Sequence, residues 1–164
     1  MTASVLLDTS FLISLVDQHR RNHAVAVKYY QWLLGQQIPM YFSSIVAAEF
    51  SIKQPITELP LRNFRSVSFS VPHGQVAGLL WNDLNPHEAS VSRRVARDDV
   101  KLIAQACHEK IPFLLTEDTS TLLRYCDRLR ALGRCNTRAI PLAEGFNTSA
   151  FNENGQQGLD LEMD

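Results

Sequence analysis

The chain has 164 residues, which is the length of one ordinary domain with room for a sizeable core. Apolar residues make up 45% of it and charged residues 20%, a balance typical of a folded globular protein and not of a disordered one. The formal net charge of −1 excludes a global excess of lysine and arginine, so any binding of nucleic acid must depend on a local site.

Targeting and redox signals in the sequence are weak. No apolar run reaches the ~20 residues of a membrane span, and the chain begins directly with a strand-like segment, so we expect a cytoplasmic protein that does not bind membranes. The three cysteines, Cys107, Cys126 and Cys135, lack the paired spacing of zinc or redox sites. We expect them to be reduced thiols packed as small apolar side chains.

Short apolar runs alternate with helix-like stretches, which is typical of an α/β protein with a parallel sheet. The expected strands are 4–7, 39–43, 66–71, 111–116 and, at an edge of the sheet, 137–142. The expected helices are one from Ser10 and others over about 22–35, 45–52 (capped by Ser44), 74–84, 98–110 and 120–133. Segments 53–65 and 85–96 are expected to be irregular. The sequence thus predicts a three-layer α/β/α fold with a central, mostly parallel five-stranded sheet.

The character of the chain changes near its end. Residues 145–164 contain four acidic residues, no lysine or arginine and few large apolar side chains. Such a composition cannot bury enough apolar surface to offset the entropy of ordering. We therefore expect one domain over residues 1–144 and an acidic, flexible C-terminal tail over 145–164.

Four acids occupy informative positions. Asp8 follows the first expected strand and Asp118 follows the fourth, in the run LLTED. In an open parallel sheet, ligands bind beyond the carboxyl ends of the strands, so both side chains reach one crevice if these strands are neighbours. Asp99 opens the helix before the fourth strand, and Glu49 lies on a helix whose other residues are mostly apolar.

Each acid also has a structural interpretation. Asp8 or Asp99 can cap a helix, a role that contributes about 0.5–2 kcal/mol, and Asp118 can be a turn residue. Several carboxylates in one crevice repel each other, however, because two unit charges ~4 Å apart cost ~4 kcal/mol at an effective dielectric constant of ~20. A divalent cation offsets that repulsion, and ligands that are all oxygen favour Mg²⁺ or Mn²⁺ over zinc.

The segments LLDTSFLISL, SSIVAAEF and DDVKLIAQACHEKIPFLLTED together resemble the PIN-domain family of metal-dependent nucleases. They are particularly similar to toxins of the virulence-associated protein C (VapC) type. The resemblance covers residues 4–142 and assigns the four acidic positions to Asp8, Glu49, Asp99 and Asp118, with Asp98 as second choice for the third.

Smaller details of the family pattern are present as well. The hydroxyl residues after the first strand correspond to Thr9 and Ser10, and the T-x-D motif to Thr116 and Asp118. Many relatives carry a further aspartate two residues later, where this chain has Ser120, so the number of metal ions stays open. Thr9, Ser10, Thr116 and Ser120 are expected to support the site by hydrogen bonding.

The resemblance implies an endoribonuclease that cleaves single-stranded RNA with a water activated by Mg²⁺ or Mn²⁺. It also implies a cognate antitoxin protein and a homodimer as partners. An acidic site repels RNA, and Arg93, Arg94 and Arg97 are predicted to bind its phosphates, with Arg20 and Arg21 as a weaker pair.

Three other classes of protein are alternatives. A receiver domain has its acidic pair after the first strand, whereas the pair in this chain is Asp98 and Asp99. A phosphatase of the haloacid dehalogenase type requires a second aspartate two residues after Asp8, where Ser10 stands. A catalytically silent PIN-like module that binds RNA or a protein remains the alternative, although all four acids are retained.

Overall fold

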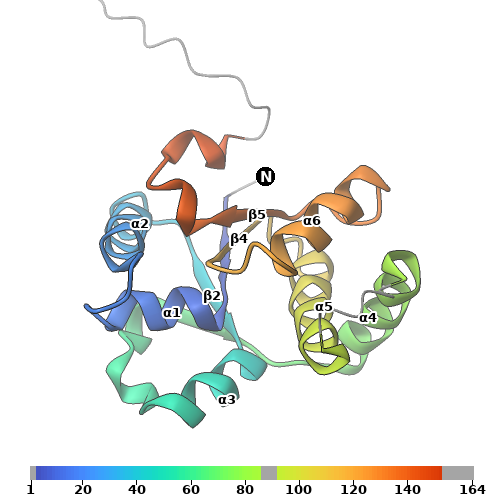
Figure 1. The fold of residues 1–164 in the computed structure, drawn as a ribbon, viewed down its shortest axis with the longest axis horizontal. Helices are drawn as coiled ribbons and strands as arrows, with labels where there is room; N and C mark the ends of the chain where they lie inside the picture. Colours follow the sequence, from blue (N-terminus) through green and yellow to red (C-terminus); the bar gives the residue numbers. More distant parts are fainter. Residues whose placement is uncertain (1–2, 86–91, 153–164) are drawn as a thin grey trace, which may run out of the picture.

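The computed structural model describes residues 3–85 and 92–152 of the chain. Within them, five strands form one parallel sheet in the order β3-β2-β1-β4-β5 (Figure 1). The strands are β1 (Val5–Leu7), β2 (Met40–Ser43), β3 (Phe64–Val67), β4 (Phe113–Thr116) and β5 (Arg138–Pro141). The predicted sheet is confirmed, with β1 and β4 as central neighbours and β5 at an edge.

Helices cover both faces of this sheet, as Figure 1 shows. They are α1 (Thr9–Val16), α2 (His23–Gly35), α3 (Ser44–Lys53), α4 (Val71–Leu84), α5 (Arg93–His108) and α6 (Leu122–Ala131). In β1, Val5 and Leu7 pack with α1 and α2, while Leu6 faces the core formed with α4, α5 and α6. A strand buried on both faces explains the uninterrupted aliphatic run, and the three predicted layers are confirmed.

Two predicted boundaries are wrong at the edge of the sheet. The third strand was expected over 66–71 but lies over Phe64–Val67. Its partner β2 ends at Ser43, which pairs with Val67, so no ladder exists for later residues. The cap of α3 is Ser43, whose hydroxyl accepts the Ile45 backbone N–H at 3.1 Å, and not Ser44.

The start of α5 was also predicted too late. The helix begins at Arg93, because the hydroxyl of Ser92 caps it by accepting the Val95 backbone N–H. Asp99 therefore lies in the second turn and does not cap its own helix. Of the predicted loop 85–96, residues 86–91 lie outside the described part of the chain.

The predicted tail begins too early. Residues Thr148–Phe151 form a short 3-10 helix, and the Phe151 ring packs against the rings of Tyr29, Trp32 and Phe113 at centroid distances of 4.9–6.0 Å. Phe151 is only 7% exposed, so this segment belongs to the core. Residues 153–164 of the predicted tail lie outside the described residues.

Cys107, Cys126 and Cys135 are free thiols, as expected, and the latter two are buried. Of the helices in residues 3–85 and 92–152, none combines the length and apolar character needed to cross a bilayer.

Candidate active site

The site lies where the strand order reverses. From β1 the chain continues to β2 on one side, while β4 lies on the other, with Leu7 paired to Leu115. Asp8 and Asp118 follow these two central strands, at their carboxyl ends. This is the position at which open α/β sheets bind ligands.

Asp8 has two roles at this point. It is the N-cap of α1 and accepts the Phe11 backbone N–H at 2.8 Å. The hydroxyls of Ser10 and Thr116 also donate to its carboxylate, which is 4% exposed. Asp8 therefore caps a helix and also belongs to the candidate site, because the N-cap of α1 lies at the carboxyl end of β1, beside the crevice.

Asp99 and Asp118 are joined by a residue that the sequence analysis missed. Thr121 donates its hydroxyl to both carboxylates. It is the N-cap of α6, yet its side chain makes no cap hydrogen bond. Asp118 is also held by the backbone N–H and the hydroxyl of Ser120, both at 2.8 Å. The sequence signal for Thr121 was its position three residues after Asp118, at the expected start of a helix.

Glu49 approaches from α3. Its carboxylate accepts a hydrogen bond from the hydroxyl of Thr9, the first residue of α1. On the same helix Val46 and Phe50 are fully buried, which fixes the face that Glu49 presents. The predicted supporting residues Thr9, Ser10, Thr116 and Ser120 thus all contact a predicted acid.

One pocket of about 390 Å³ contains the predicted set: Asp8, Glu49, Asp99 and Asp118 all line it. Thr9 and Ser10 line it as well. Four elements supply the acids, which come from the ends of β1 and β4 and from α3 and α5. The structure therefore brings together side chains that are up to 110 positions apart in sequence.

The pKa values of the acids record their burial first and the crowding of negative charge second. Burial raises the pKa of Asp8 from 3.8 to about 6. Burial also raises the pKa of Asp99 to about 7, and the charges of Asp118, Asp8 and Glu49 add to that rise. At Asp118, burial acts in the same direction, but hydrogen bonds from Thr121 and Ser120 outweigh it and lower the pKa. Neutral hydroxyl groups orient these carboxylates without removing their charge, so the pocket favours a cation.

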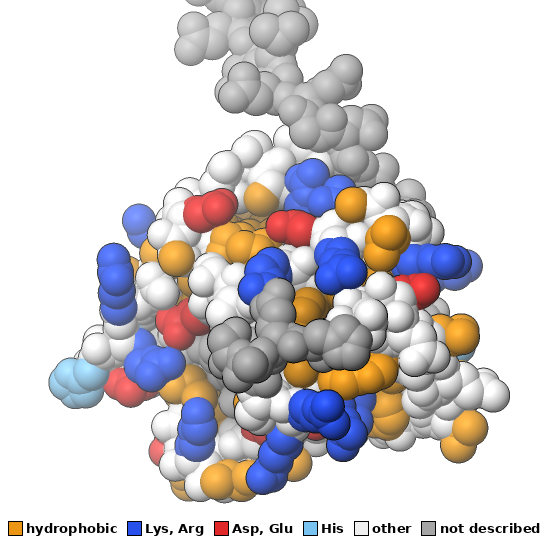
Figure 2. All heavy atoms as spheres, turned by 45° about the vertical axis from the view of Figure 1, so that its right-hand side comes forward, with side chains coloured by type: hydrophobic (Ala, Val, Ile, Leu, Met, Phe, Trp, Pro, Cys, Tyr) orange, Lys and Arg blue, Asp and Glu red, His pale blue; other side chains and the backbone are white. Residues whose placement is uncertain are grey.

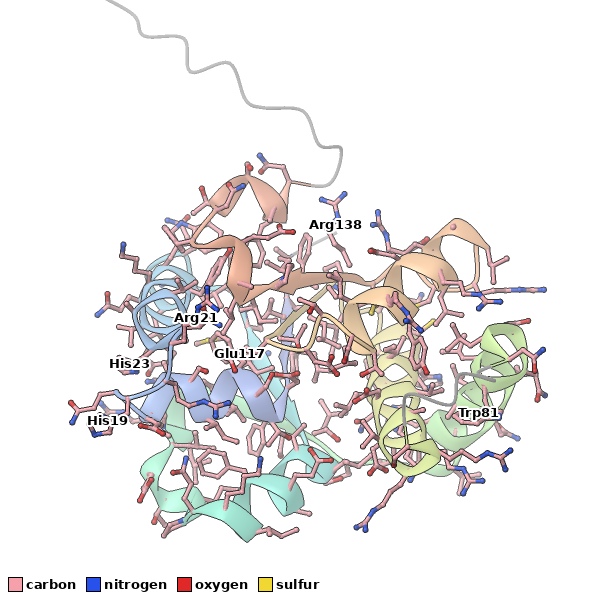
Figure 3. All side chains as sticks on the ribbon, in the orientation of Figure 1. His19, Arg21, His23, Trp81, Glu117 and Arg138 are labelled. Atoms are coloured by element: carbon pink, nitrogen blue, oxygen red, sulfur yellow. The ribbon has the colours of Figure 1, made fainter. Side chains whose placement is uncertain are left out.

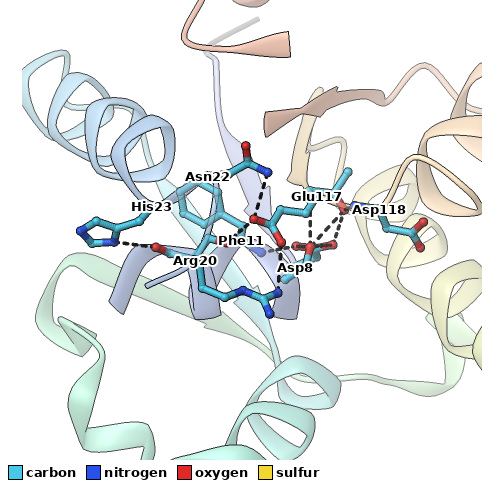
Figure 4. A network of polar contacts seen from close by, with 10 residues as sticks. Asp8, Phe11, Arg20, Asn22, His23, Glu117 and Asp118 are labelled. Atoms are coloured by element: carbon cyan, nitrogen blue, oxygen red, sulfur yellow. Dashed lines mark hydrogen bonds and ion pairs between the residues drawn. The ribbon is translucent and has the colours of Figure 1, made fainter. Parts of the chain in front are cut away.

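Glu117 is the second residue that the sequence analysis missed. It lies at the bend that follows β4, and its carboxylate contacts α1 and the segment that leads into α2. Figure 4 shows Arg20 and Asn22 converging on it, both at 3.2 Å, and the Ser14 hydroxyl donates to it as well. The ion pair holds the Arg20 side chain, which is 44% exposed and lines the pocket. Its position between Thr116 and Asp118, two residues of the predicted site, was the sequence signal that could have identified Glu117.

The basic residues of α5 lie elsewhere. Arg93, Arg94 and Arg97 are exposed and none is among the described residues that line the pocket. The Arg97 guanidinium lies over the Trp81 ring at 5.9 Å from its centroid, and Figure 3 places Trp81 on the far side of α5 from Glu117. Figure 2 shows lysine and arginine side chains spread across this face of the molecule among apolar ones. The pocket's own cations are instead Arg20 and Lys53.

Asp98 and Asp99 are distinguished by their surroundings. Asp98 is 32% exposed and pairs with Lys101 at 3.3 Å, on the outer surface of α5. Asp99 is 9% exposed and lines the pocket. The geometry favours Asp99 as the member of the pair that belongs to the site.

A separate group, His73, His108 and Glu109, brings three possible metal-ligand atoms within 4.8 Å of one another. The Ser70 backbone N–H donates to His73 Nδ1 at 3.0 Å, so Nδ1 carries the lone pair and Nε2 carries the proton. That proton is donated to Glu109 at 2.7 Å. His73 is therefore occupied by a capping box and a hydrogen bond, which gives it a structural role at the start of α4.

Comparisons with known proteins identify the fold of this chain. No protein-family model matches the chain, and no curated protein matches it in sequence. Solved structures of VapC-type and FitB-type PIN-domain toxins match over most of its length. The chain has the PIN-domain fold.

Three of these structures show the extent of the likeness. FitAcB from Neisseria gonorrhoeae superposes with a TM-score of 0.61 at 15% identity, covering 85% of this chain and 98% of its own. VapBC2 from Rickettsia felis, bound to a promoter DNA fragment, gives 0.56 at 16%, covering 84% and 97%. VapC20 from Mycobacterium tuberculosis, described as a toxin that cleaves the sarcin–ricin loop, gives 0.53 at 17%, covering 82% and 99%. At such identities the likeness establishes the PIN fold alone.

Proposed function

We propose that the chain is a Mg²⁺- or Mn²⁺-dependent endoribonuclease that cleaves single-stranded RNA and serves as the toxin of a toxin–antitoxin pair. The observation that carries the proposal is the meeting of Asp8, Glu49, Asp99 and Asp118 in one pocket beyond the central strands. The PIN fold and the toxin activity described for VapC20 support it.

The donor set fits a hard cation. All four acidic side chains offer oxygen, which suits a hard cation. Burial is the main cause of the raised pKa values of Asp8 and Asp99, and neighbouring carboxylates add to it, so a bound cation would stabilise their charged forms. When bound, such an ion supplies positive charge that lowers the pKa of a water molecule and stabilises a departing oxyanion.

The chain's own residues have distinct tasks in this proposal. The four carboxylates hold the cation, and the hydroxyls of Thr9, Thr116 and Thr121 fix their orientation by donating hydrogen bonds. Arg20 and Lys53, at the pocket, attract RNA phosphates towards an otherwise acidic surface. Attack of water on phosphorus with departure of the 3′ oxygen leaves a 5′-phosphate and a 3′-hydroxyl.

A small antitoxin protein and a second copy of the chain are the proposed partners. Structures of FitAcB and VapBC2, which are similar to this chain, support the first of these. Copurification with the protein encoded by the adjacent reading frame tests it. Light scattering of the chain at several concentrations tests the homodimer.

Cleavage assays with the purified protein test the catalytic part. Asp8→Asn, Glu49→Gln, Asp99→Asn and Asp118→Asn should each lower Mg²⁺-dependent RNA cleavage at least about 100-fold, since even changes to groups behind metal ligands cost 10–100-fold. Asp98→Asn is the matched control and should retain activity, because Asp98 lies outside the pocket. Undiminished cleavage by the four folded variants would end the assignment of these acids as catalytic groups. Absence of metal-dependent cleavage by the folded wild-type chain would favour the catalytically silent module instead.

Expression in bacteria tests the toxin role separately. The wild-type chain should arrest growth, and Asp8→Asn should relieve the arrest. Harmless expression of a protein that cleaves RNA in the test tube would indicate a housekeeping nuclease instead.

A further inference from the structure

The pocket that contains the acids has an apolar rim. Ile52, on α3, is 83% exposed, and Val95, on α5, is 48% exposed. Both line the pocket, from opposite helices. A single exposed aliphatic side chain is ordinary on a protein surface. Two exposed aliphatic side chains on either side of a pocket that contains four acids are less usual and indicate a surface that can contact a ligand.

Each apolar residue of the rim lies on the same helix as one of the acids. Ile52 follows Glu49 by three residues on α3, and Val95 precedes Asp99 by four on α5, so each pair shares one helix face. One helical turn, about 5.4 Å along the axis, separates each apolar side chain from its acid. α3 starts at the carboxyl end of β2, and α5 leads back towards the start of β4. Both apolar residues therefore lie on the outer side of the acids.

Cations lie beside this rim. Lys53 follows Ile52 directly and lines the pocket, as does Arg20, which Glu117 holds at 3.2 Å. One cavity of about 390 Å³ thus combines acids that can hold a metal ion, two cationic side chains and an apolar rim, which together suit the chemically different parts of a nucleotide. They correspond to the phosphate on its ion, the neighbouring phosphates and the base.

We infer that Ile52 and Val95 form a base clamp, which holds one unstacked base of a single-stranded RNA beside the phosphate that is cleaved. The inference rests on the proposed function for the position of that phosphate. Apolar side chains contact the face of a base and leave its hydrogen-bonding edges unread, so the clamp accepts different bases. A duplex keeps its bases stacked and paired, so the clamp selects single strands.

Charge favours RNA over an apolar protein segment as the occupant. A protein helix laid on Ile52 and Val95 would bury the Asp99 and Glu49 carboxylates and Lys53 without pairing them, which is costly. A nucleotide places its phosphate near the cations and its apolar base face on the rim.

Fluorescence anisotropy tests the clamp without depending on cleavage. Two labelled probes of equal charge are compared in Ca²⁺: a 12-nucleotide oligouridylate and a 12-unit abasic oligomer with the same backbone. The wild-type chain should bind the oligouridylate more tightly, and Ile52→Ala or Val95→Ala should reduce that preference by about threefold to tenfold. Lys53→Ala should weaken binding of both probes alike. The matched control is Leu79→Ala, because Leu79 is 66% exposed on α4 and does not line the pocket.

The outcomes separate the clamp from the nuclease. Equal affinity of the wild type for both probes, or an unchanged preference in the Ile52→Ala and Val95→Ala variants, overturns the clamp even if RNA is cleaved. A base preference that depends on these residues in a chain without nuclease activity keeps the clamp and rejects the proposed chemistry. Loss of binding to a protein partner with an unchanged base preference assigns the rim to a protein interface.

Discussion

Asp99 and Asp118, which belong to different elements, accept hydrogen bonds from the same hydroxyl group, that of Thr121. Thr121→Val keeps the shape of the side chain but leaves two neighbouring carboxylates without this donor. We expect the free energy of unfolding at pH 8 in EDTA to fall by about 1–3 kcal/mol, measured by urea denaturation. Thr121→Ser keeps a hydroxyl and is the control. An undiminished stability of Thr121→Val together with a loss in Thr121→Ser would show that the methyl group, and not the hydrogen bonds, matters.

The raised pKa of Asp99 predicts a pH dependence of stability. Its pKa is 3.8 in the unfolded chain and about 7 in the folded one, so the folded state binds the proton more tightly. The stability that this group contributes is therefore present below about pH 4 and is lost as the pH rises to about 7. Asparagine does not titrate. In EDTA, Asp99→Asn should gain stability relative to wild type across this range, by at most about 4 kcal/mol. A constant difference between the two proteins from pH 4 to pH 8 would contradict the assignment.

Divalent metal should stabilise the protein, and more so at higher pH. Ligand carboxylates must be deprotonated, and the pKa values of Asp8 and Asp99 are about 6 and about 7. The rise in melting temperature on adding Mn²⁺ or Mg²⁺ should thus grow between pH 5.5 and pH 7.5. Asp8→Asn should abolish most of it and Asp98→Asn should not. An increase of the same size in the Asp8→Asn protein would place the bound metal elsewhere.

Glu117 should act through Arg20. Glu117→Gln removes the ion pair but keeps an amide that can bind Asn22 and Ser14, and a partly exposed pair contributes at most about 1 kcal/mol to stability. We expect little change in melting temperature but a higher KM for RNA, since Arg20 would no longer be held at the pocket. Arg20→Ala should raise KM similarly, and the double variant no further. Additive effects of the two changes would mean that these residues act independently.

The packing of residues 145–152 predicts that Phe151 is part of the domain. Phe151→Ala should lower the free energy of unfolding by about 3–5 kcal/mol, because a buried ring among Tyr29, Trp32 and Phe113 is lost. Phe146, 39% exposed, offers the comparison, and Phe146→Ala should cost less. Similar small effects of both changes would show that residues 145–152 do not contribute to the core and belong to the predicted tail.

The five strands and the positions of the four acids were predictable because they leave local signals, whereas the order of the strands in the sheet was not predicted. Buried parallel strands are continuous aliphatic runs, and Asp8 and Asp118 end two of them. The end of β3 was not predictable from its own residues, because the length of its partner β2 sets it. The charged run before Asp99 concealed the first five residues of α5, 93–97. Of these only Ala96 is buried, and its burial depends on the core on the other face of the sheet. Thr121 and Glu117 form contacts over long sequence distances, which periodicity does not encode.

Because one carboxylate both starts α1 and faces the pocket, the choice of substitution at Asp8 decides what an experiment reports. Asparagine caps helices about as well as aspartate, so Asp8→Asn isolates the loss of charge, whereas Asp8→Ala also unravels the first turn of a helix. Glu49 carries no such second duty. A mutational survey that ranked these positions by alanine scanning would therefore overstate the chemical importance of Asp8 relative to that of Glu49.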